Sequence, residues 1–476
     1  MTNPRRIYLL SPKAYSPETI AVTFAKTSRS PRPFDEIAAE LNDDRSARFH
    51  EKWVVGYGHS SVAEHAVLHL ALENISRLAI ETIEGNRLAS YTEKSTRYQQ
   101  WNDDAFYVPQ ELDGHPLAKK FIVTCKHLFT TYQACIPRVQ DWLRKTMPRD
   151  EGESENAYSR RIAPASVDIC RFLLPAASLA NVGVTINARA LEYAICKMLS
   201  SPLVEVRQIG EQVREAGQKE TPTLIKYADC NPYLVQTRKE MTQRSKGIPK
   251  GSSGTNFRLW SYDPDGENKI LAAVLFRFSS DRSYEDCLDF VNQLGSVEKT
   301  ALLDSLLSER GRFDQPLREL EYAQMTFEIE MDQGAYFEFK RHRMMTQTVQ
   351  PLTASLGFAI PRGMVGAGCE EVYLDAMRQA AGLYDELAAW NPDVAGYIVP
   401  NGFNRRVLMT MNLRQAFHFC QLRAAENAHF SIRLVALKMR EALLQVYPSL
   451  TKFMFIPERD SWQNIEETHF SSLKTA

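Results

Sequence analysis

The 476-residue sequence lacks features that define several large classes of protein. No stretch approaches the roughly 20 consecutive apolar residues that cross a bilayer, so we expect no membrane span. Met1 to Arg6 are followed by only a short apolar patch, so we expect no signal peptide. The formal net charge is −1, which gives no general electrostatic reason to expect nucleic acid or a membrane as partner.

Cysteine is present but scattered. The eight cysteines form no Cys-x-x-Cys pair, and no Cys/His cluster has zinc-finger spacing. His59 and His65 are six residues apart with no third ligand in view, so we expect no metal site. The cysteines indicate reduced, mostly buried thiols and a cytoplasmic protein. The sequence leaves a nucleophilic cysteine open.

The length accommodates two domains of about 200 residues each. The clearest linker is the polar, basic segment Gln236 to Asn256, which ends near a Gly-Ser-Ser-Gly run. We therefore expect an N-terminal domain at 1–235, a linker at 236–256 and a C-terminal domain at 257–476. A second polar stretch, Arg149 to Arg161, predicts a surface loop.

Short segments of the first half return in the second half in the same order, which indicates a tandem duplication. Two of them return at an offset of 225 residues and one at 252. The pairs are Thr185 to Arg189 with Thr410 to Arg414, Leu173 to Pro175 with Ile398 to Pro400, and Phe106 to Pro109 with Phe358 to Pro361.

The apolar spacing predicts an α+β fold in each half, with a mixed sheet and long helices. Val67 to Ile75 alternates in part, and Thr326 to Met331 alternates cleanly, as a half-buried strand does. Ala190 to Val213 and Gln415 to Leu444 carry apolar residues at helical spacing. Ser61, with Glu64 three residues later, can begin a helix as a capping box.

Several polar patterns allow both an ordinary and a functional interpretation. The cation cluster Arg341-His342-Arg343 is either a solvated surface or an oxyanion site, because planar guanidiniums bind oxyanions through paired donors. Ser95 and Arg97 are two residues apart, so an extended loop points both the same way. Arg414 and His418 are four apart and share a helix face, whereas Arg423 falls on roughly the opposite side.

Two segments resemble separated pieces of one motif of the flavin-dependent thymidylate synthase family, in which Arg-His-Arg runs almost directly into a segment ending Ser-x-Arg-Tyr. The first half keeps the end, at Leu88 to Tyr98, but has Gly85-Asn86-Arg87 where the triplet belongs. The second half keeps the triplet at Arg341, but Thr346 to Ala354 follows it. Asn412 to Arg423 also resembles the family's helix segment, whose final arginine is replaced in the first half by Met198.

The resemblance implies FAD as cofactor, methylenetetrahydrofolate and NADPH as co-substrates, and reductive methylation of dUMP at C5. It implies catalytic roles for Arg423 and His342. The substrate-binding residues that it implies are Glu93, Ser95, Arg97, Arg171, Glu338, Arg341 and Arg423. The cofactor-binding residues that it implies are His59, Ser61, Glu64, Arg341, His342, Arg343, Asn412, Arg414 and His418.

The surviving substrate residues divide between the halves, which suggests one composite site and a homodimer that imitates a tetramer of single domains. Glu338 departs from the family, which usually carries Gln there. A carboxylate offers only acceptors, whereas Gln offers an acceptor and donors. This departure leaves open another pyrimidine nucleotide such as dCMP, and a non-catalytic flavin- or nucleotide-binding scaffold is the third hypothesis.

Overall fold

The structure is a computed structural model. It describes residues 6, 8, 10–27, 30–56, 60–97, 99–249, 256–457 and 459–475, without the side chains of four residues in 43–56. His59, expected to bind the cofactor, lies outside the described residues, as does the Gly-Ser-Ser-Gly run.

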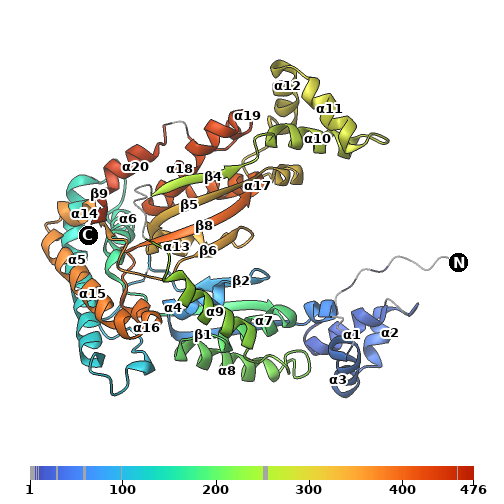
Figure 1. Ribbon diagram of the computed structural model, residues 1–476, viewed down its shortest axis with the longest axis horizontal. Helices are drawn as coiled ribbons and strands as arrows, with labels where there is room; N and C mark the ends of the chain where they lie inside the picture. The colour runs from blue at the N-terminus through green and yellow to red at the C-terminus, as the bar shows by residue number, and fades with distance from the viewer. Residues whose placement is uncertain are drawn as a thin grey trace. The chain divides into compact units, whose positions relative to one another are not determined.

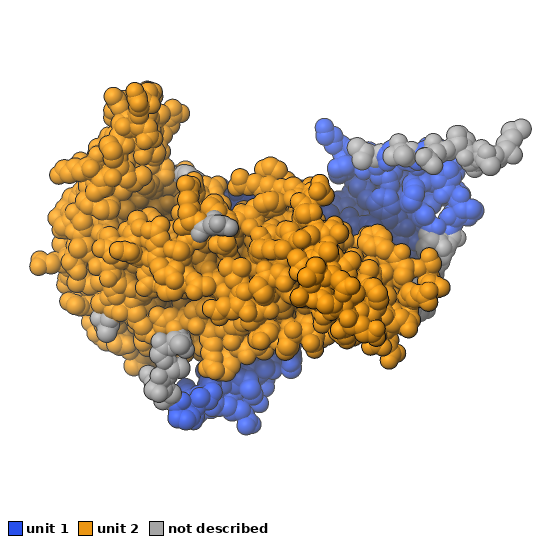
Figure 2. Space-filling view, turned by 90° about the horizontal axis from the view of Figure 1, so that it is seen from above, with its two compact units in different colours: residues 1–94, 106–118, 177–251 blue, residues 95–105, 119–176, 252–476 orange. Residues whose placement is uncertain are grey.

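The chain forms two compact units, coloured in Figure 2. Unit 1 contains residues 1–94, 106–118 and 177–251, and unit 2 contains residues 95–105, 119–176 and 252–476. The units differ from the expected domains because two segments of the first half pack with the second half. The segment 171–176 shows why: the amides of Ala176 and Asn401 donate to the carbonyls of Val399 and Leu174 at 3.0 Å.

Unit 1 is built on a three-stranded antiparallel sheet of order β1-β3-β2. Its strands are β1 (Val67–Ser76), β2 (Ala89–Glu93) and β3 (Leu179–Asn187). The main helices of the unit are α1 (Pro17–Thr27), α2 (Phe34–Ala39), α3 (Asp43–His50), α4 (Arg77–Glu84), α7 (Ala188–Leu199), α8 (Val204–Gln218) and α9 (Pro232–Ser245). Alternate residues of β3 are buried, so its apolar side chains supply one wall of the core.

Unit 2 contains a four-stranded sheet of order β4-β5-β8-β6 and a two-stranded sheet of β7 and β9 (Figure 1). The strands are β4 (Phe257–Tyr262), β5 (Gln324–Asp332), β6 (Thr346–Val349), β7 (Phe358–Pro361), β8 (Asn404–Asn412) and β9 (Phe470–Thr475). The expected strand at Thr326 to Met331 is confirmed as β5. Its residues alternate between buried and half-buried positions, because one face of the sheet packs on the core.

The helices of unit 2 include a pair from the first half of the chain, α5 (Ala118–Thr146, apart from its first residue) and α6 (Glu155–Cys170). Those that shape the site are α13 (Gln333–Phe339), α14 (Arg362–Gly366), α17 (Leu413–Arg423), α18 (Phe430–Val446) and α20 (Trp462–His469). The others are α10 (Gly266–Phe278), α11 (Tyr284–Gln293), α12 (Ser296–Leu307), α15 (Glu370–Trp390), α16 (Pro392–Ala395) and α19 (Pro448–Thr451).

The two sheets share one pairing pattern. In unit 1, Ser90 of β2 lies opposite Thr185 of β3. In unit 2, Thr346 of β6 lies opposite Thr410 of β8. Thr185 and Thr410 are the start of the repeated Thr-x-Asn-x-Arg segment, so the repeat occupies equivalent sheet positions. The structure thus agrees with two tandem segments of the same α+β architecture.

Two polar segments are partly helical. The segment expected as a linker from Gln236 is helical up to Ser245, as part of α9. Asn231 caps this helix and Pro232 occupies its first turn, and the charged residues that follow are good helix formers. The polar stretch expected as a loop at 149–161 is likewise helical from Glu155, where α6 begins after the cap Ser154.

The expectation of mostly buried thiols is confirmed for six of the eight cysteines, while Cys196 is half-buried and Cys230 is exposed. None of the helices in the described part of the chain is long and apolar enough to span a membrane.

Candidate active site

The centre of the site is the contact of Arg423 with His342 and Glu338. Arg423 ends α17, and its Nε donates to Nε2 of His342 across 2.9 Å. Its Nη1 lies 3.1 Å from Oε2 of Glu338, which lies in the last turn of α13. The side chains are 13% exposed for Arg423 and 9% for Glu338, so this ion pair is largely withdrawn from water. A charged pair at this burial needs further partners to be stable.

His342 is neutral in this arrangement. Burial lowers the pKa of its imidazole well below the usual value, and the charges of Arg423 and Arg341 lower it further. Because Nε2 accepts the hydrogen bond from Arg423, the ring proton is assigned to Nδ1. The ring also contacts those of Phe419 and His418, with centroids 4.9 and 5.5 Å away.

His418 and Arg423 therefore meet at the same imidazole, although ideal helix geometry predicted nearly opposite faces. Both belong to α17. The arginine side chain is long, and side chains on a helix lean toward its N-terminus, so the guanidinium of Arg423 reaches back to His342.

Arg171 supplies the second cation beside Glu338. It begins the short 3-10 helix Arg171–Leu173 that follows α6, and its side chain is 4% exposed. Its Nη2 lies 3.5 Å from Oε1 of Glu338, and its Nη1 donates to the hydroxyl of Thr96 at 3.4 Å. Burial acts to raise the pKa of Glu338, but the charges of Arg171, Arg423 and Arg97 outweigh it, so the pKa is lowered. Glu338 is thus a carboxylate between two guanidiniums.

Arg97 is fixed by a carboxylate that the sequence motifs did not indicate. Its Nε donates to Oδ1 of Asp168 at 2.9 Å, and its Nη2 donates to Oδ2 at 2.8 Å. Its Nη1 donates to the carbonyl of Asn427 at 2.9 Å. Paired donors on a carboxylate fix both the position and the plane of a guanidinium.

His429 is a further residue that the sequence analysis missed. It caps α18, accepting the Ser431 amide at Nδ1, and its Nε2 lies 3.0 Å from the carbonyl oxygen of Asp168. Nε2 therefore carries the proton and donates it. Burial, followed by the charge of Arg171, lowers the pKa of His429 well below its usual value, so it is a neutral donor. The sequence offered one signal, a polar residue immediately before a helical apolar pattern.

The other expected substrate residues take different environments. Ser95 accepts the amide of Arg97 at its hydroxyl, which shapes the turn that carries Arg97. Glu93 lies in unit 1, where it forms a buried ion pair of 3.1 Å with Arg77. Arg341 is exposed at the start of the triplet.

The expected cofactor residues are only partly gathered. Arg341, His342, Arg343 and His418 lie in unit 2 around the end of α13 and on α17, whereas Ser61 and Glu64 lie in unit 1. Asn412 caps α17 in a reciprocal arrangement with Gln415, and Arg414 pairs with Glu321 at 3.1 Å.

The pair Arg414–Glu321 has a counterpart in unit 1, where Arg189 pairs with Glu64. Each arginine lies in the first turn of the helix after the last strand of its sheet, and each glutamate lies in a 3-10 helix just before a strand that pairs with that last strand, β1 in unit 1 and β5 in unit 2. The expected capping box of Ser61 and Glu64 is replaced by this ion pair. Across the residues that are described, no three His, Cys, Asp or Glu side chains are grouped to hold a metal ion.

The fold and site together define an α+β protein with a buried cluster in which two arginines flank one carboxylate. The sequence model of a family described as thymidylate synthase complementing protein matches residues 10–223 and 258–449. The chain belongs to this family, and two tandem segments of it match.

Relatives of two lengths are similar to this chain. A UPF0159 protein of Chlamydia muridarum is 33% identical over 433 residues, which cover 87% of this chain and 82% of the relative. A UPF0159 protein of Thermoplasma acidophilum is 27% identical over 462 residues, covering 86% and 89%. A flavin-dependent thymidylate synthase of Clostridium tetani is 24% identical over 216 residues, covering 45% of this chain and 82% of the relative.

Proposed function

We propose that this protein is a flavin-dependent enzyme that methylates a pyrimidine nucleotide at C5, with dUMP as the default substrate, at a composite site. One observation carries the proposal. Arg97 and Arg171, from the first matched segment, lie in the same compact unit as Glu338, His342 and Arg423 from the second. Arg171 and Arg423 approach opposite oxygens of one carboxylate.

The proposed substrate contacts follow from charge. Arg97 and Arg171 suit a nucleotide phosphate, because guanidiniums bind oxyanions through paired donors. Asp168 and Thr96 hold these arginines before the substrate arrives, which reduces the ordering cost of binding. Ser95 orients the turn of Arg97, and Glu93 anchors the strand before it through Arg77.

Arg423 and His342 suit the pyrimidine ring. A guanidinium directed at a ring carbonyl favours negative charge on the ring, which is the change that makes C5 nucleophilic. Glu338 and His342 fix that guanidinium through two of its nitrogens. His342 holds its proton at Nδ1 and, as a neutral donor, can support a carbonyl without adding a positive charge.

The residues of unit 2 fit an anionic planar cofactor such as reduced FAD. The donor set is two arginines, Arg341 and Arg343, with the imidazoles of His342 and His418 between the ends of α13 and α17. Burial, then Arg423 and Arg414, lowers the pKa of His418, so it too is a neutral donor. When bound, the flavin would carry the one-carbon unit and reducing equivalents that derive from methylenetetrahydrofolate and NADPH.

We propose that Asn412 and Arg414 support this cofactor site indirectly, by fixing the helix α17. Asn412 begins α17 through its cap, and Arg414 ties the helix to Glu321 and to the carbonyl of Pro316. Their protein contacts fix the helix that carries His418. Ser61 and Glu64 of unit 1 remain proposed cofactor contacts.

Glu338 favours a second candidate substrate, dCMP. A carboxylate accepts hydrogen bonds well from the exocyclic amino group of cytosine. In uracil the corresponding position is a carbonyl, which only accepts. Arg423 and Arg171 already face Glu338. The preference between dUMP and dCMP therefore depends on how the contacts of these two arginines with Glu338 rearrange when the nucleotide binds.

The test is a product analysis with a flavin control. Protein incubated with FAD and desalted is expected to absorb near 450 nm, roughly where oxidised flavins do. The reduced protein is then given methylenetetrahydrofolate with dUMP or dCMP, and product masses are measured. A mass gain of one methyl group on either nucleotide identifies the substrate. Flavin binding without any product would support the scaffold hypothesis instead.

A further inference from the structure

A cavity lined in part by Arg97 lies among the helices of unit 2. It has a volume of about 440 Å³, within the roughly 300–1,000 Å³ range of small-molecule sites. Helices α5, α6, α14, α18 and α20 contribute its walls. None of Arg171, Glu338, His342 or Arg423 lines it.

The walls include the aromatic rings of Trp142, Phe430 and His469 among aliphatic and polar residues. Phe430 and His469 stack with centroids 4.8 Å apart and an angle of 2° between the rings. Trp142 lies against α14 where only glycine fits, since a Cβ at Gly366 would approach its indole nitrogen to 2.3 Å. Burial, then the charge of Arg433, lowers the pKa of His469 to about 4, so near neutral pH this wall is an uncharged aromatic surface.

The charges at the cavity favour an anion. Asp168 is paired with Arg97, and Glu426 is paired with Arg459 outside the cavity. Two further arginines line the cavity, Arg362 and Arg433.

The protein contacts of these two arginines engage a minority of their donors. Arg362 donates from Nη2 to the carbonyl of Phe470. Arg433 donates from Nε to the carbonyl of Ala424 and from Nη2 to Asp460. An arginine has five N–H donors, so both retain capacity for a ligand as far as the described residues show.

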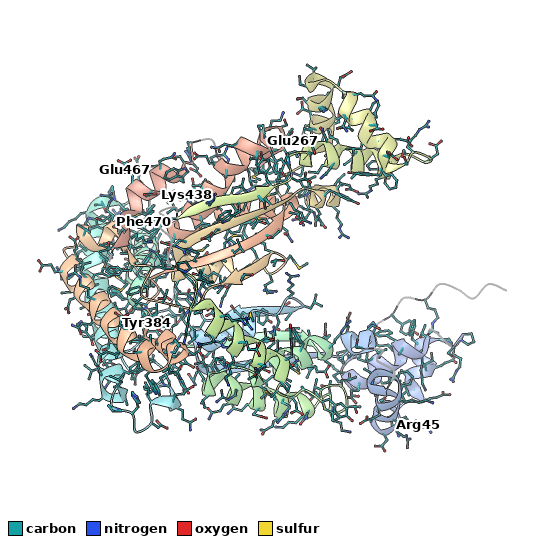
Figure 3. The ribbon with its side chains drawn as sticks, viewed as in Figure 1. Arg45, Glu267, Tyr384, Lys438, Glu467 and Phe470 are labelled. Carbon is teal, nitrogen blue, oxygen red and sulfur yellow. The ribbon has the colours of Figure 1, made fainter. Side chains whose placement is uncertain are left out.

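One wall lies outside the matched family segments. Thr468 and His469 close the cavity from the end of α20, between Glu467 and Phe470, which Figure 3 labels. The second matched segment ends at residue 449. This wall is therefore an element of this chain beyond the part that establishes its family.

We propose that this cavity is an accessory binding site for a small planar aromatic molecule with an anionic group. The ring would pack on Trp142, Phe430 and His469, and the anionic group would bind Arg362 and Arg433. The site is separate from the candidate active site and shares one wall with it, the pair Asp168–Arg97.

The experiment uses anilinonaphthalene sulfonate, a planar aromatic anion whose fluorescence rises in apolar sites. The wild-type chain is expected to bind about one probe per chain, with binding that saturates. Arg433→Gln removes a cation and should weaken binding about tenfold. Ala165→Phe adds a ring to the cavity wall and should abolish binding. Arg282→Gln is the matched control, because Arg282 is exposed and neither it nor its partner Asp281 lines the cavity, so this variant should bind the probe as the wild type does.

Circular dichroism and thermal unfolding establish that each variant is folded. If Ala165→Phe does not fold, the comparison of probe binding by Arg433→Gln and Arg282→Gln decides the question. Unchanged binding in Arg433→Gln would overturn the proposal, because the probe would then bind elsewhere, for example on exposed Phe278. Saturating dUMP should leave the probe bound, and its complete displacement would show that the cavity belongs to the nucleotide site.

Discussion

Arg423 and His342 are 81 residues apart in the sequence, and a hydrogen bond of 2.9 Å joins Nε of the arginine to Nε2 of the imidazole. The bond determines the tautomer of His342 and, together with Glu338, the direction of the guanidinium. A neutral imidazole beside a fixed cation can support developing negative charge without a proton transfer of its own. This pair is the proposed catalytic centre.

Arg97→Ala should weaken nucleotide binding by about 1.5–3 kcal/mol, because it removes a charge-assisted contact to the phosphate. The sheet pairing makes Thr353 the corresponding position in the second segment, so Thr353→Ala is the matched control. It removes two hydrogen bonds, both with Ser355, and should leave binding and turnover nearly unchanged. Titration calorimetry with dUMP measures nucleotide binding by both variants. A larger loss in Thr353→Ala than in Arg97→Ala would contradict the composite site.

Glu338→Gln should destabilise the fold at pH 7 by about 1–3 kcal/mol, because it leaves two buried guanidiniums without their carboxylate. The folded pKa of Glu338 is lowered, so its stabilisation is present above roughly pH 4.3 and is lost as the pH falls through the folded pKa. Urea unfolding from pH 7 to pH 3 should therefore show the two proteins converging in acid. A difference that is independent of pH would exclude this electrostatic explanation.

The same substitution tests substrate choice. Gln restores a donor where the family usually has one, so Glu338→Gln should shift the preference between dCMP and dUMP toward dUMP. The ratio of kcat/KM for the two nucleotides measures this shift. An unchanged ratio would show that Glu338 does not contact the base.

His429→Asn should raise KM for the nucleotide more than it changes kcat. Asn can still cap α18 but loses the bond from Nε2 to Asp168, which fixes Arg97. A matched cap variant, Asn391→Ser on α16, should leave KM unchanged because that helix is not linked to Arg97. Equal effects on KM in the two variants would show that His429 acts only as a helix cap.

The pH dependence of stability gives an independent check on His429. Its folded pKa is lowered, so its stabilisation is fully present above roughly pH 6.5 and is lost as the pH falls below that. Between pH 6.5 and 5, wild type should lose up to about 1.4 kcal/mol per pH unit more than His429→Asn. Parallel pH profiles of the two proteins would show that folding does not lower the pKa of this imidazole.

We also expect a homodimer, because each tandem segment should bury the face that a single-domain protein buries against its copy. Light scattering should then give twice the 54.3 kDa chain mass. A fully active protein at the mass of one chain would contradict this expectation.

Local sequence patterns predicted many elements because strands and helices depend on nearby residues. The alternation at Thr326 to Met331 gave β5, and the helical spacing from Gln415 gave α17 and α18. Polar composition did not reveal helix α9 or the start of α6, because charged residues form exposed helices as readily as loops. α9 contains no buried residue, and in α6 the buried residues begin only at Tyr158.

The sequence by itself determined the family, the tandem arrangement, and which half keeps each motif residue. Only the tertiary structure decided which of them meet: the helices of 119–176 pack in unit 2, and Asp168 there joins Arg97 to His429, 261 residues further along the chain. Glu93, by contrast, pairs with Arg77 inside unit 1. Periodicity and spacing report local geometry, whereas contacts over hundreds of residues depend on how buried faces pack, and no local pattern encodes that choice.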